Sequence, residues 1–211
     1  MYRKFWKRLI DFVLSLLALI LLFVPLLILS AIIFFSDPGP VFFVQKRVGI
    51  HKTFFRLHKF RSMKQSTPHD TPTHLLENPE QYITAIGKFL RRTSLDELPQ
   101  LWDILIGKMS FVGPRPALWN QDDLIALRDR YGACDVRPGL TGWAQINGRD
   151  ELELGVKAKL DGDYVAVLNY GGWRAFLFDC KCFFGTFSSA VRGDGILEGG
   201  TGKMHKNGEN K

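Results

Sequence analysis

The chain has 211 residues, of which 46% are hydrophobic, and a formal net charge of +7. This length supports one compact domain with an appendage and excludes two full domains. The positive charge favours anionic partners, such as lipid headgroups or phosphate-bearing substrates. Nucleic acid is the alternative partner, but the basic residues flank an apolar segment instead of following a recognition helix. We therefore expect no nucleic-acid binding.

The apolar segment at residues 12–36 contains no charged residue and consists almost wholly of Leu, Ile, Val, Phe and Ala. A helix of this length, at about 1.5 Å per residue, could cross the roughly 30 Å hydrocarbon core of a bilayer. The run is too long for a cleavable signal peptide. It therefore predicts a membrane element, which is either a spanning helix or a re-entrant one.

Two features favour the re-entrant form over a kinked spanning helix. Basic residues outnumber acidic ones on both sides of the segment, and the positive-inside rule places both flanks on the cytoplasmic side. Pro25 cannot donate a backbone hydrogen bond and clashes with the carbonyl of Leu21, so a bend there would let the chain leave on the face it entered. The basic flank residues are Arg3, Lys4, Lys7 and Arg8 before the segment, and Lys46, Arg47, Lys52, Arg56, Lys59, Arg61 and Lys64 after it.

The rest of the chain is mixed and polar, as in a water-soluble domain. Residues 41–45 and 54–60 predict two strands joined through Gly49. Residues 65–82 predict a loop, and residues 193–211, rich in Gly, Lys and Asn, predict a disordered tail. Helices are predicted at residues 87–92, 99–106, 122–131 and 151–164.

Residues 173–191 are aromatic and apolar with few charges. Trp and Phe are typical of helices that lie in the membrane interface, so this stretch predicts an interfacial amphipathic helix. Ordinary packing in the protein core explains the same composition equally well, and both alternatives stay open.

The densest chemical motif lies at residues 91–102 and contains two arginines followed by Asp96 and Glu97. One interpretation is structural: Ser94 and Glu97 have the spacing of a helix capping box. The other is catalytic, because a carboxylate beside arginines keeps a low pKa and serves as an anionic nucleophile or a magnesium ligand. Phosphoryl transfer needs such an oxygen, together with a cation and guanidinium groups on the phosphates.

Two further loops supply polar groups. Arg115 stands between Pro114 and Pro116, which stiffen its backbone. Residues 137–149 run from Arg137 to Arg149 and contain glycines for close backbone approach, Trp143 as a stacking face, and Gln145 and Asn147 as hydrogen-bonding groups. This inventory suits a nucleotide-sugar.

In these motifs the chain resembles the monotopic bacterial sugar transferases, the polyprenyl-phosphate phosphoglycosyl transferases, over about nine-tenths of its length. It is most similar to the small members with one re-entrant helix. The motifs, in the order of the family, occupy residues 46–49, 59–63, 93–100, 113–116 and 137–143. One departure is Val24, where family members commonly have serine before the proline; the bend must then rely on Pro25 alone or on Ser15 or Ser30 as a donor.

The resemblance implies a two-step reaction. Asp96 would attack the sugar-proximal phosphorus of a UDP-sugar, UMP would leave, and undecaprenyl phosphate would then accept the phospho-sugar. Glu97 would help to activate the acceptor or hold the metal, and Mg²⁺ is expected at Asp96. The resemblance places Lys59, Arg91 and Arg115 around the substrate phosphates, with Asp161 or Asp163 as a further acidic position. The product would begin the assembly of an O-antigen, capsule, exopolysaccharide or glycoprotein glycan.

The expected fold is α+β and mainly helical, with a re-entrant membrane helix at 1–36, a small catalytic domain at 37–192 and the tail at 193–211. The domain would combine a short β-hairpin with interfacial amphipathic helices. It would lie on the cytoplasmic face of the bacterial inner membrane, against the inner leaflet. The identity of the sugar stays open, as does a homodimer.

Two rival functions remain to be weighed. The same basic clusters would suit a non-catalytic, membrane-anchored module that binds anionic lipid. A CDP-alcohol phosphotransferase needs several spanning helices and an Asp-Gly-x-x-Ala-Arg motif, and residues 161–164 do not extend into that pattern.

Overall fold

The computed structural model describes residues 1–67, 79–148 and 152–192, with the backbone alone for residues 187–192. It is a mainly helical α+β protein with a bent pair of apolar N-terminal helices and a β-hairpin, as the sequence predicted, and it has a second small sheet that the sequence did not predict. The predicted tail at 193–211 and most of the predicted loop at 65–82 lie outside the described residues, as does Arg149.

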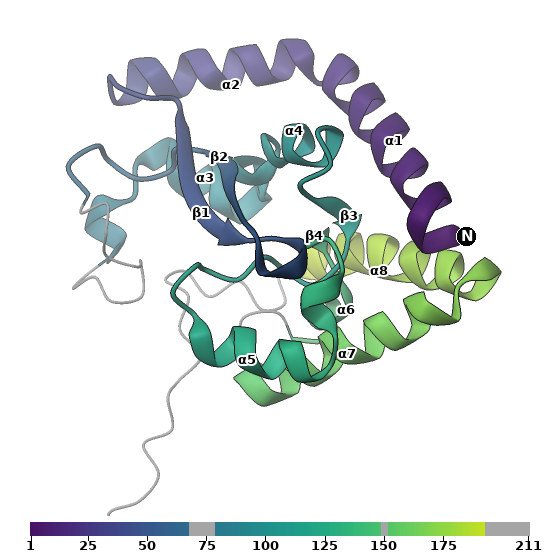
Figure 1. The fold of residues 1–211 in the computed structure, drawn as a ribbon. Coiled ribbons are helices and arrows are strands. Elements are labelled where there is room, and N and C mark those ends of the chain that lie inside the picture. Colours follow the sequence, from purple (N-terminus) through teal and green to yellow (C-terminus); the bar gives the residue numbers. More distant parts are fainter. Residues whose placement is uncertain (68–78, 149–151, 193–211) are drawn as a thin grey trace, which may run out of the picture.

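The apolar segment forms two helices that meet at an angle. A π-helical turn at Tyr2–Trp6 leads into α1 (Lys7–Leu21), and α2 (Phe23–Ser36) follows after Leu22. The axes differ by 62° (Figure 1). Pro25 lies in the first turn of α2, so the break falls three residues before the proline, next to the carbonyl that its ring would contact.

Neither serine considered as a helper bonds that freed carbonyl at Leu21. Ser30 donates to the carbonyl of Leu26 at 2.7 Å, and Ser15 donates to that of Phe12 at 3.1 Å. The missing N–H of Pro25 is therefore the local cause of the break. Within the described residues, no helix by itself has both the length and the apolar character to cross a bilayer, whereas the bent pair together meets both criteria.

The start of the pair is fixed to the rest of the protein by buried polar contacts. The carboxylate of Asp179, in α8 (Gly172–Arg192), accepts hydrogen bonds from Tyr2 at 2.6 Å and from Lys7 at 2.7 Å. The guanidinium of Arg8 donates to the last carbonyls of α4 (Gln100–Leu105), at Ile104 and Leu105. Charges that the sequence assigned to the membrane surface are therefore used inside the protein.

The other end of the pair is fixed in the same way. Asp37 follows α2, and its backbone carbonyl accepts a hydrogen bond from Arg61, whose guanidinium also lies 3.4 Å from the Asp37 carboxylate. Ile33 of α2 is buried against Phe60 and Leu90. Both ends of the bent pair therefore contact one and the same body of the protein, while its outer face stays apolar. Exposed side chains on that face include Leu17, Ile20, Leu21, Phe23, Val24, Leu27, Ile28 and Phe35.

A β-hairpin follows α2. Strand β1 (Phe42–Val48) pairs antiparallel with β2 (Phe54–Phe60), so the two predicted strands are confirmed and the first is longer than expected. Phe55 and Leu57 of β2 pack beneath the bend, in a core with Leu101 and Ile104 of α4 and with Leu22. The hairpin therefore joins the apolar pair to the polar domain.

The predicted helices are present with shifted ends. They are α3 (Ala85–Thr93), α4, α5 (Asp122–Arg130) and α7 (Leu154–Tyr170), with the short α6 (Trp143–Ile146) before α7. The sequence did not predict β3 (Ser110–Val112) and β4 (Gly139–Thr141), which pair in parallel. A Cβ on Gly139 would lie 2.1 Å from the backbone nitrogen of Gly113, so only glycine allows this approach.

Helix α8 confirms core packing for one face of residues 173–186, while its place in a membrane interface stays a prediction. Trp173, Leu177 and Phe184 are exposed and follow one another at helical spacing. Ala175 and Cys182 are buried in the core beside Tyr164 of α7. One face of the helix is therefore ordinary core, and the other is an apolar surface.

We predict that both ends of the bent pair lie on the same side of a bilayer. Lys4→Cys and Thr53→Cys, at exposed positions, are made separately in a Cys180→Ser background, which leaves only buried cysteines. A membrane-impermeant maleimide should label both variants in inverted inner-membrane vesicles and neither in intact cells. Labelling of the two sites from opposite sides would show a spanning helix instead.

Candidate active site

The Asp96–Glu97 pair is presented by a tight turn between two helices. Ser94 ends α3 in the left-handed conformation, with φ of 56°, and a 3-10 turn (Leu95–Glu97) follows. The side chain of Ser94 makes no capping hydrogen bond, and the N-cap residue of α4 is Pro99. The capping-box interpretation was therefore wrong. A serine in this conformation carries strain of about 1–2 kcal/mol. Such strain is found at functional sites more often than elsewhere.

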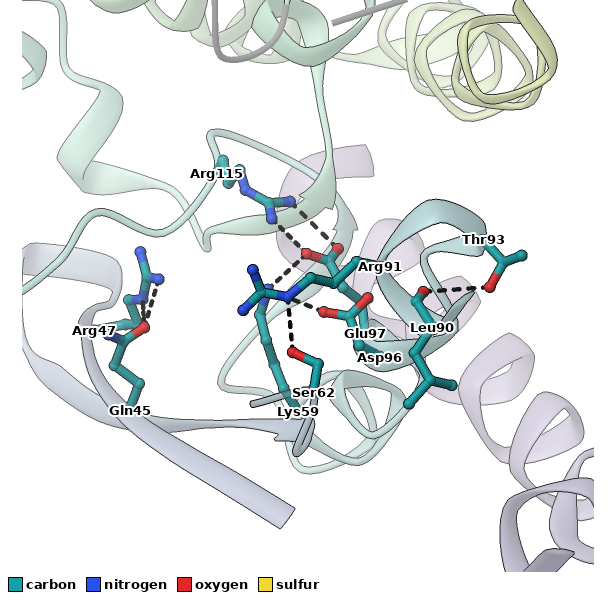
Figure 2. Close-up of polar contacts among 10 residues, drawn as sticks. All are labelled: Gln45, Arg47, Lys59, Ser62, Leu90, Arg91, Thr93, Asp96, Glu97 and Arg115. Atoms are coloured by element: carbon teal, nitrogen blue, oxygen red, sulfur yellow. Dashed lines mark hydrogen bonds and ion pairs between the residues drawn. The ribbon is translucent and has the colours of Figure 1, made fainter. Parts of the chain in front are cut away.

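Glu97 is bound by two cations from distant segments. Its Oε1 lies 2.8 Å from Nζ of Lys59, which extends from β2. The same oxygen accepts a hydrogen bond from Nη2 of Arg115, and Oε2 lies 3.3 Å from Nη1 of that guanidinium. Figure 2 shows this bidentate contact and Lys59 below it. Both carboxylate oxygens are therefore occupied by side chains of the protein.

Asp96 lies beside this triad with weaker contacts. Its Oδ2 is 3.9 Å from Nζ of Lys59, and the residue is 8% exposed. Arg91 extends from α3 over the same carboxylate and donates from Nε to the hydroxyl of Ser62 at 2.8 Å (Figure 2). The sequence-predicted residues Lys59, Arg91, Asp96, Glu97 and Arg115 are thus brought together.

The two adjacent carboxylates have opposite electrostatics. Burial disfavours the charge of Glu97, but Arg115 and Lys59 together outweigh it and hold the pKa of Glu97 well below its usual range. Burial raises the pKa of Asp96, assisted by the neighbouring Glu97 charge, against the lowering effect of Lys59. The expectation of a low pKa at Asp96 was therefore wrong, because Glu97 takes the close contacts. Asp96 is the carboxylate left open to a further cation.

The donor set fits magnesium in one specific way. Within residues 1–67, 79–148 and 152–192, no three side chains of His, Cys, Asp or Glu gather as a metal cage. Mg²⁺ does not require such a cage, because it commonly binds one or two carboxylates together with substrate phosphates and water. Asp96 could therefore hold Mg²⁺ only together with oxygens from a ligand.

A further arginine belongs to this region and was not among the predicted site residues. Arg47 of β1 donates to the carbonyl of Pro116 at 3.0 Å and binds the side-chain oxygen of Gln45. Burial, together with the nearby Arg115 charge, lowers the pKa of Arg47 to about 10. The sequence could have indicated Arg47 through the alternation of side chains along a strand, which places Gln45 and Arg47 on one face of β1.

Two other predicted residues lie elsewhere. Asp161 of α7 is 1% exposed and bound to Arg128, so its carboxylate does not face the Asp96 site. Arg137 donates from Nε to the carbonyl of Gly107 at 3.0 Å, after the end of α4. Arg149 lies outside the described residues.

The loop at 137–148 serves mainly the protein itself. Its glycines do permit close backbone approach, but the neighbour is Gly113: a Cβ on Gly142 would lie 2.2 Å from the Gly113 carbonyl oxygen. The ring of Trp143 packs against Phe178, with centroids 4.8 Å apart, and Lys181 lies 4.7 Å from the Trp143 centroid. The ring that was expected to stack on a substrate therefore contacts α8.

Comparison with known proteins gives a family match over almost the whole chain. Residues 2–193 match the family described as bacterial sugar transferase. A UDP-glucose:undecaprenyl-phosphate glucose-1-phosphate transferase of Xanthomonas campestris pv. campestris is 43% identical over 144 residues, covering 67% of this chain and 30% of that protein.

Two further relatives differ in length. The uncharacterised sugar transferase EpsL of Bacillus subtilis is 37% identical over 192 residues, 91% of this chain and 90% of that protein. An undecaprenyl-phosphate galactose phosphotransferase of Salmonella typhimurium is 35% identical over 213 residues, 91% of this chain and 42% of that protein. This chain thus spans less than half the length of the Xanthomonas and Salmonella relatives.

We predict a pH-dependent stability change for Glu97→Gln. The variant leaves Lys59 and Arg115 without their shared anion, which costs roughly 3–5 kcal/mol near neutral pH. Because the folded pKa of Glu97 is lowered, its contribution is complete above the unfolded value of about 4.3 and is lost as the pH falls. The gap in unfolding free energy between native and variant proteins in detergent should therefore narrow below about pH 4. A gap that stays constant would contradict this electrostatic role; Asp122→Asn, at an exposed acid, is the control.

Proposed function

This chain belongs to the bacterial sugar transferase family, and we propose that it transfers a sugar-1-phosphate from a UDP-sugar to undecaprenyl phosphate. The activities named for the Xanthomonas and Salmonella relatives support this reaction class. Those two relatives use different sugars by name, glucose and galactose, so the family match does not assign the sugar for this chain.

The observation that carries the proposal is the pairing of two unlike carboxylates at one turn. Glu97 is neutralised by Lys59 and Arg115, whereas Asp96 lies 3.9 Å from Nζ of Lys59. An anchored Glu97 keeps both cations in place at the side of Asp96. Phosphoryl transfer requires cations that already lie where the negative charge of the phosphate groups must be stabilised.

In the proposed first step, an Oδ atom of Asp96 attacks the sugar-proximal phosphorus of the donor. The bond from that phosphorus to the bridging oxygen breaks, and UMP leaves with the electron pair. The product is an acyl phosphate, a mixed anhydride between the carboxyl group of Asp96 and the phospho-sugar. Lys59, Arg91 and Arg115 are placed to stabilise the phosphate oxygens during this step.

In the proposed second step, a phosphate oxygen of undecaprenyl phosphate attacks the same phosphorus. The bond to Asp96 breaks, which restores the carboxylate and releases the diphosphate-linked lipid. Because both oxygens of Glu97 are bound by Lys59 and Arg115, we propose that its main part is to hold these cations and not to contact the metal. Asp96 would be the residue that holds Mg²⁺, which would supply positive charge against the phosphates of the donor.

The acceptor lipid requires the site to be near a membrane. The exposed apolar side chains of α1 and α2, together with the fixation of both ends to the same body, support a re-entrant pair in the inner leaflet. The exposed apolar face of α8, with Trp173 and Leu177, supports contact with the interface. We accordingly propose the cytoplasmic face of the bacterial inner membrane as its location.

The rival is a membrane-anchored module that only binds anionic lipid. Such a module needs exposed cations, but several flank cations are already bound to protein groups: Lys7 to Asp179, Arg61 to Asp37 and Lys59 to Glu97. The geometry therefore favours the enzyme.

We predict that Asp96→Asn lowers UMP release by roughly 10³-fold or more, because an amide is a far weaker nucleophile than a carboxylate. UMP is measured with a panel of UDP-sugars and undecaprenyl phosphate, and membrane recovery should equal that of the native chain. Asp122→Asn, which removes an exposed carboxylate, should retain activity. Native-level turnover by Asp96→Asn would end the covalent proposal.

We predict that the native protein becomes labelled when it is mixed with a sugar-labelled donor in the absence of acceptor lipid. The label should survive brief denaturation in acid, as expected for an acyl phosphate on Asp96, and should disappear if undecaprenyl phosphate is added before quenching. Label that persists on Asp96→Asn would place the adduct elsewhere. Turnover by the native chain without any protein-bound label would refute the intermediate.

A further inference from the structure

Behind Arg115 lies a buried ion pair that contributes no atom to the Asp96 site. Asp161 of α7 accepts from Arg128 of α5 through the same oxygen, Oδ2, at 2.7 Å from Nε and 2.6 Å from Nη2. The third nitrogen of that guanidinium, Nη1, donates to the backbone carbonyl of Arg115 at 2.8 Å. Asp161 is 1% exposed and Arg128 is 5% exposed.

We infer that Asp161 and Arg128 are positioning residues, which fix the backbone of Arg115 so that its guanidinium meets Glu97 beside the nucleophile. This inference rests on the proposed function for its kinetic consequences. It differs from the part that the family resemblance suggested for Asp161, among the groups that surround the substrate.

Direct contact between substrate and this pair is opposed by burial, since Asp161 is 1% and Arg128 5% exposed, and by the small space beside Arg128. The hollow lined by Arg115, Arg128, Pro114 and Pro116 has a volume of about 20 Å³. This volume is enough for about one water molecule and far too small for a sugar or a nucleobase. The pair can therefore influence the reaction only through the residues that it holds.

The planar guanidinium explains how the position is transmitted. Asp161 fixes one edge of the Arg128 plane, and the remaining N–H groups then point in a set direction, toward the Arg115 carbonyl. On the next residue, the carbonyl of Pro116 accepts from Arg47 at 3.0 Å. Two consecutive carbonyls are thus bonded by arginines from different elements, the buried Arg128 and the half-buried Arg47, which leaves little freedom at the Arg115 backbone.

The chemistry of the pair favours positioning over stability alone. Burying two charges is costly, and an apolar pair of similar volume is often at least as stabilising. An apolar pair, however, could not bond the Arg115 carbonyl. A shift of about 1 Å in a catalytic side chain can cost roughly 100-fold in rate, so the direction of this bond has a kinetic consequence.

A double-mutant cycle tests the inference, with kcat and KM measured for UMP release by the full chain in detergent. Asp161→Asn alone should lower kcat/KM roughly 10- to 100-fold, mainly through kcat. In an Arg115→Ala background the same change should cost less than about 2-fold, because the residue it acts through is already gone. An equal loss in both backgrounds would overturn the inference.

Two variants separate positioning from charge and from general stability. Arg128→Lys keeps the positive charge but loses the planar fork, so it should be impaired as much as Asp161→Asn. Full activity of Arg128→Lys would also overturn the inference. Asp129 lies on the same helix as Arg128, α5, and forms an exposed ion pair with Lys52. Asp129→Asn breaks this pair and should leave kcat and KM unchanged.

A structural readout keeps the test independent of turnover. Hydrogen exchange, followed by mass spectrometry, should speed up in a peptide covering residues 110–119 of Asp161→Asn and not of Asp129→Asn. If the native chain releases no UMP from any UDP-sugar, the proposed function fails, but this exchange result still decides the inference. Unchanged exchange at residues 110–119 would refute it, as would faster exchange spread equally over α5 and α7.

Discussion

The carboxylate of Glu97 is shared between Lys59 and Arg115, which belong to segments far apart in the chain. Lys59 comes from the hairpin, Glu97 from the turn after α3, and Arg115 from the loop after β3. A buried anion with two cations is stable only when all three are present, since removal of one partner leaves an uncompensated charge. The same contact therefore holds three elements together and places the charges of Lys59, Glu97 and Arg115 beside Asp96. The pKa of Asp96 itself is raised by burial.

The apolar helix pair is part of this same assembly and not a separate anchor. Arg8 bonds the end of α4, the helix that begins just after the Asp96–Glu97 turn, and Leu22 at the bend packs on the same core as Leu101 of α4. A helix pair that lies in a lipid leaflet would then hold the carboxylates at a fixed depth below it. This arrangement gives a physical reason why a transferase acting on a lipid carrier would join its membrane element directly to its catalytic turn.

Buried polar contacts also change how the basic composition is understood. A net charge of +7 indicates anionic partners, but much of the positive charge is bound internally. Lys7 binds Asp179, Arg128 binds Asp161, and Arg47 bonds a backbone carbonyl. In the proposed reaction, the positive charge that acts on the substrate is the small group around Asp96.

The sequence by itself determined the elements whose signals are local. The uncharged run with Pro25 predicted a bent apolar pair, two runs of strand-forming residues joined through Gly49 predicted the hairpin, and the motif at 91–102 predicted the carboxylate pair. Strand propensity, proline chemistry and charge spacing all act within a few residues. Only the tertiary structure decided which partners those residues take. It assigned Glu97, and not Asp96, to the close ion pairs; it placed Asp161 behind Arg115; and it paired β3 with β4 through Gly113 and Gly139. These outcomes depend on contacts between residues 18 to 38 positions apart, which no local pattern encodes.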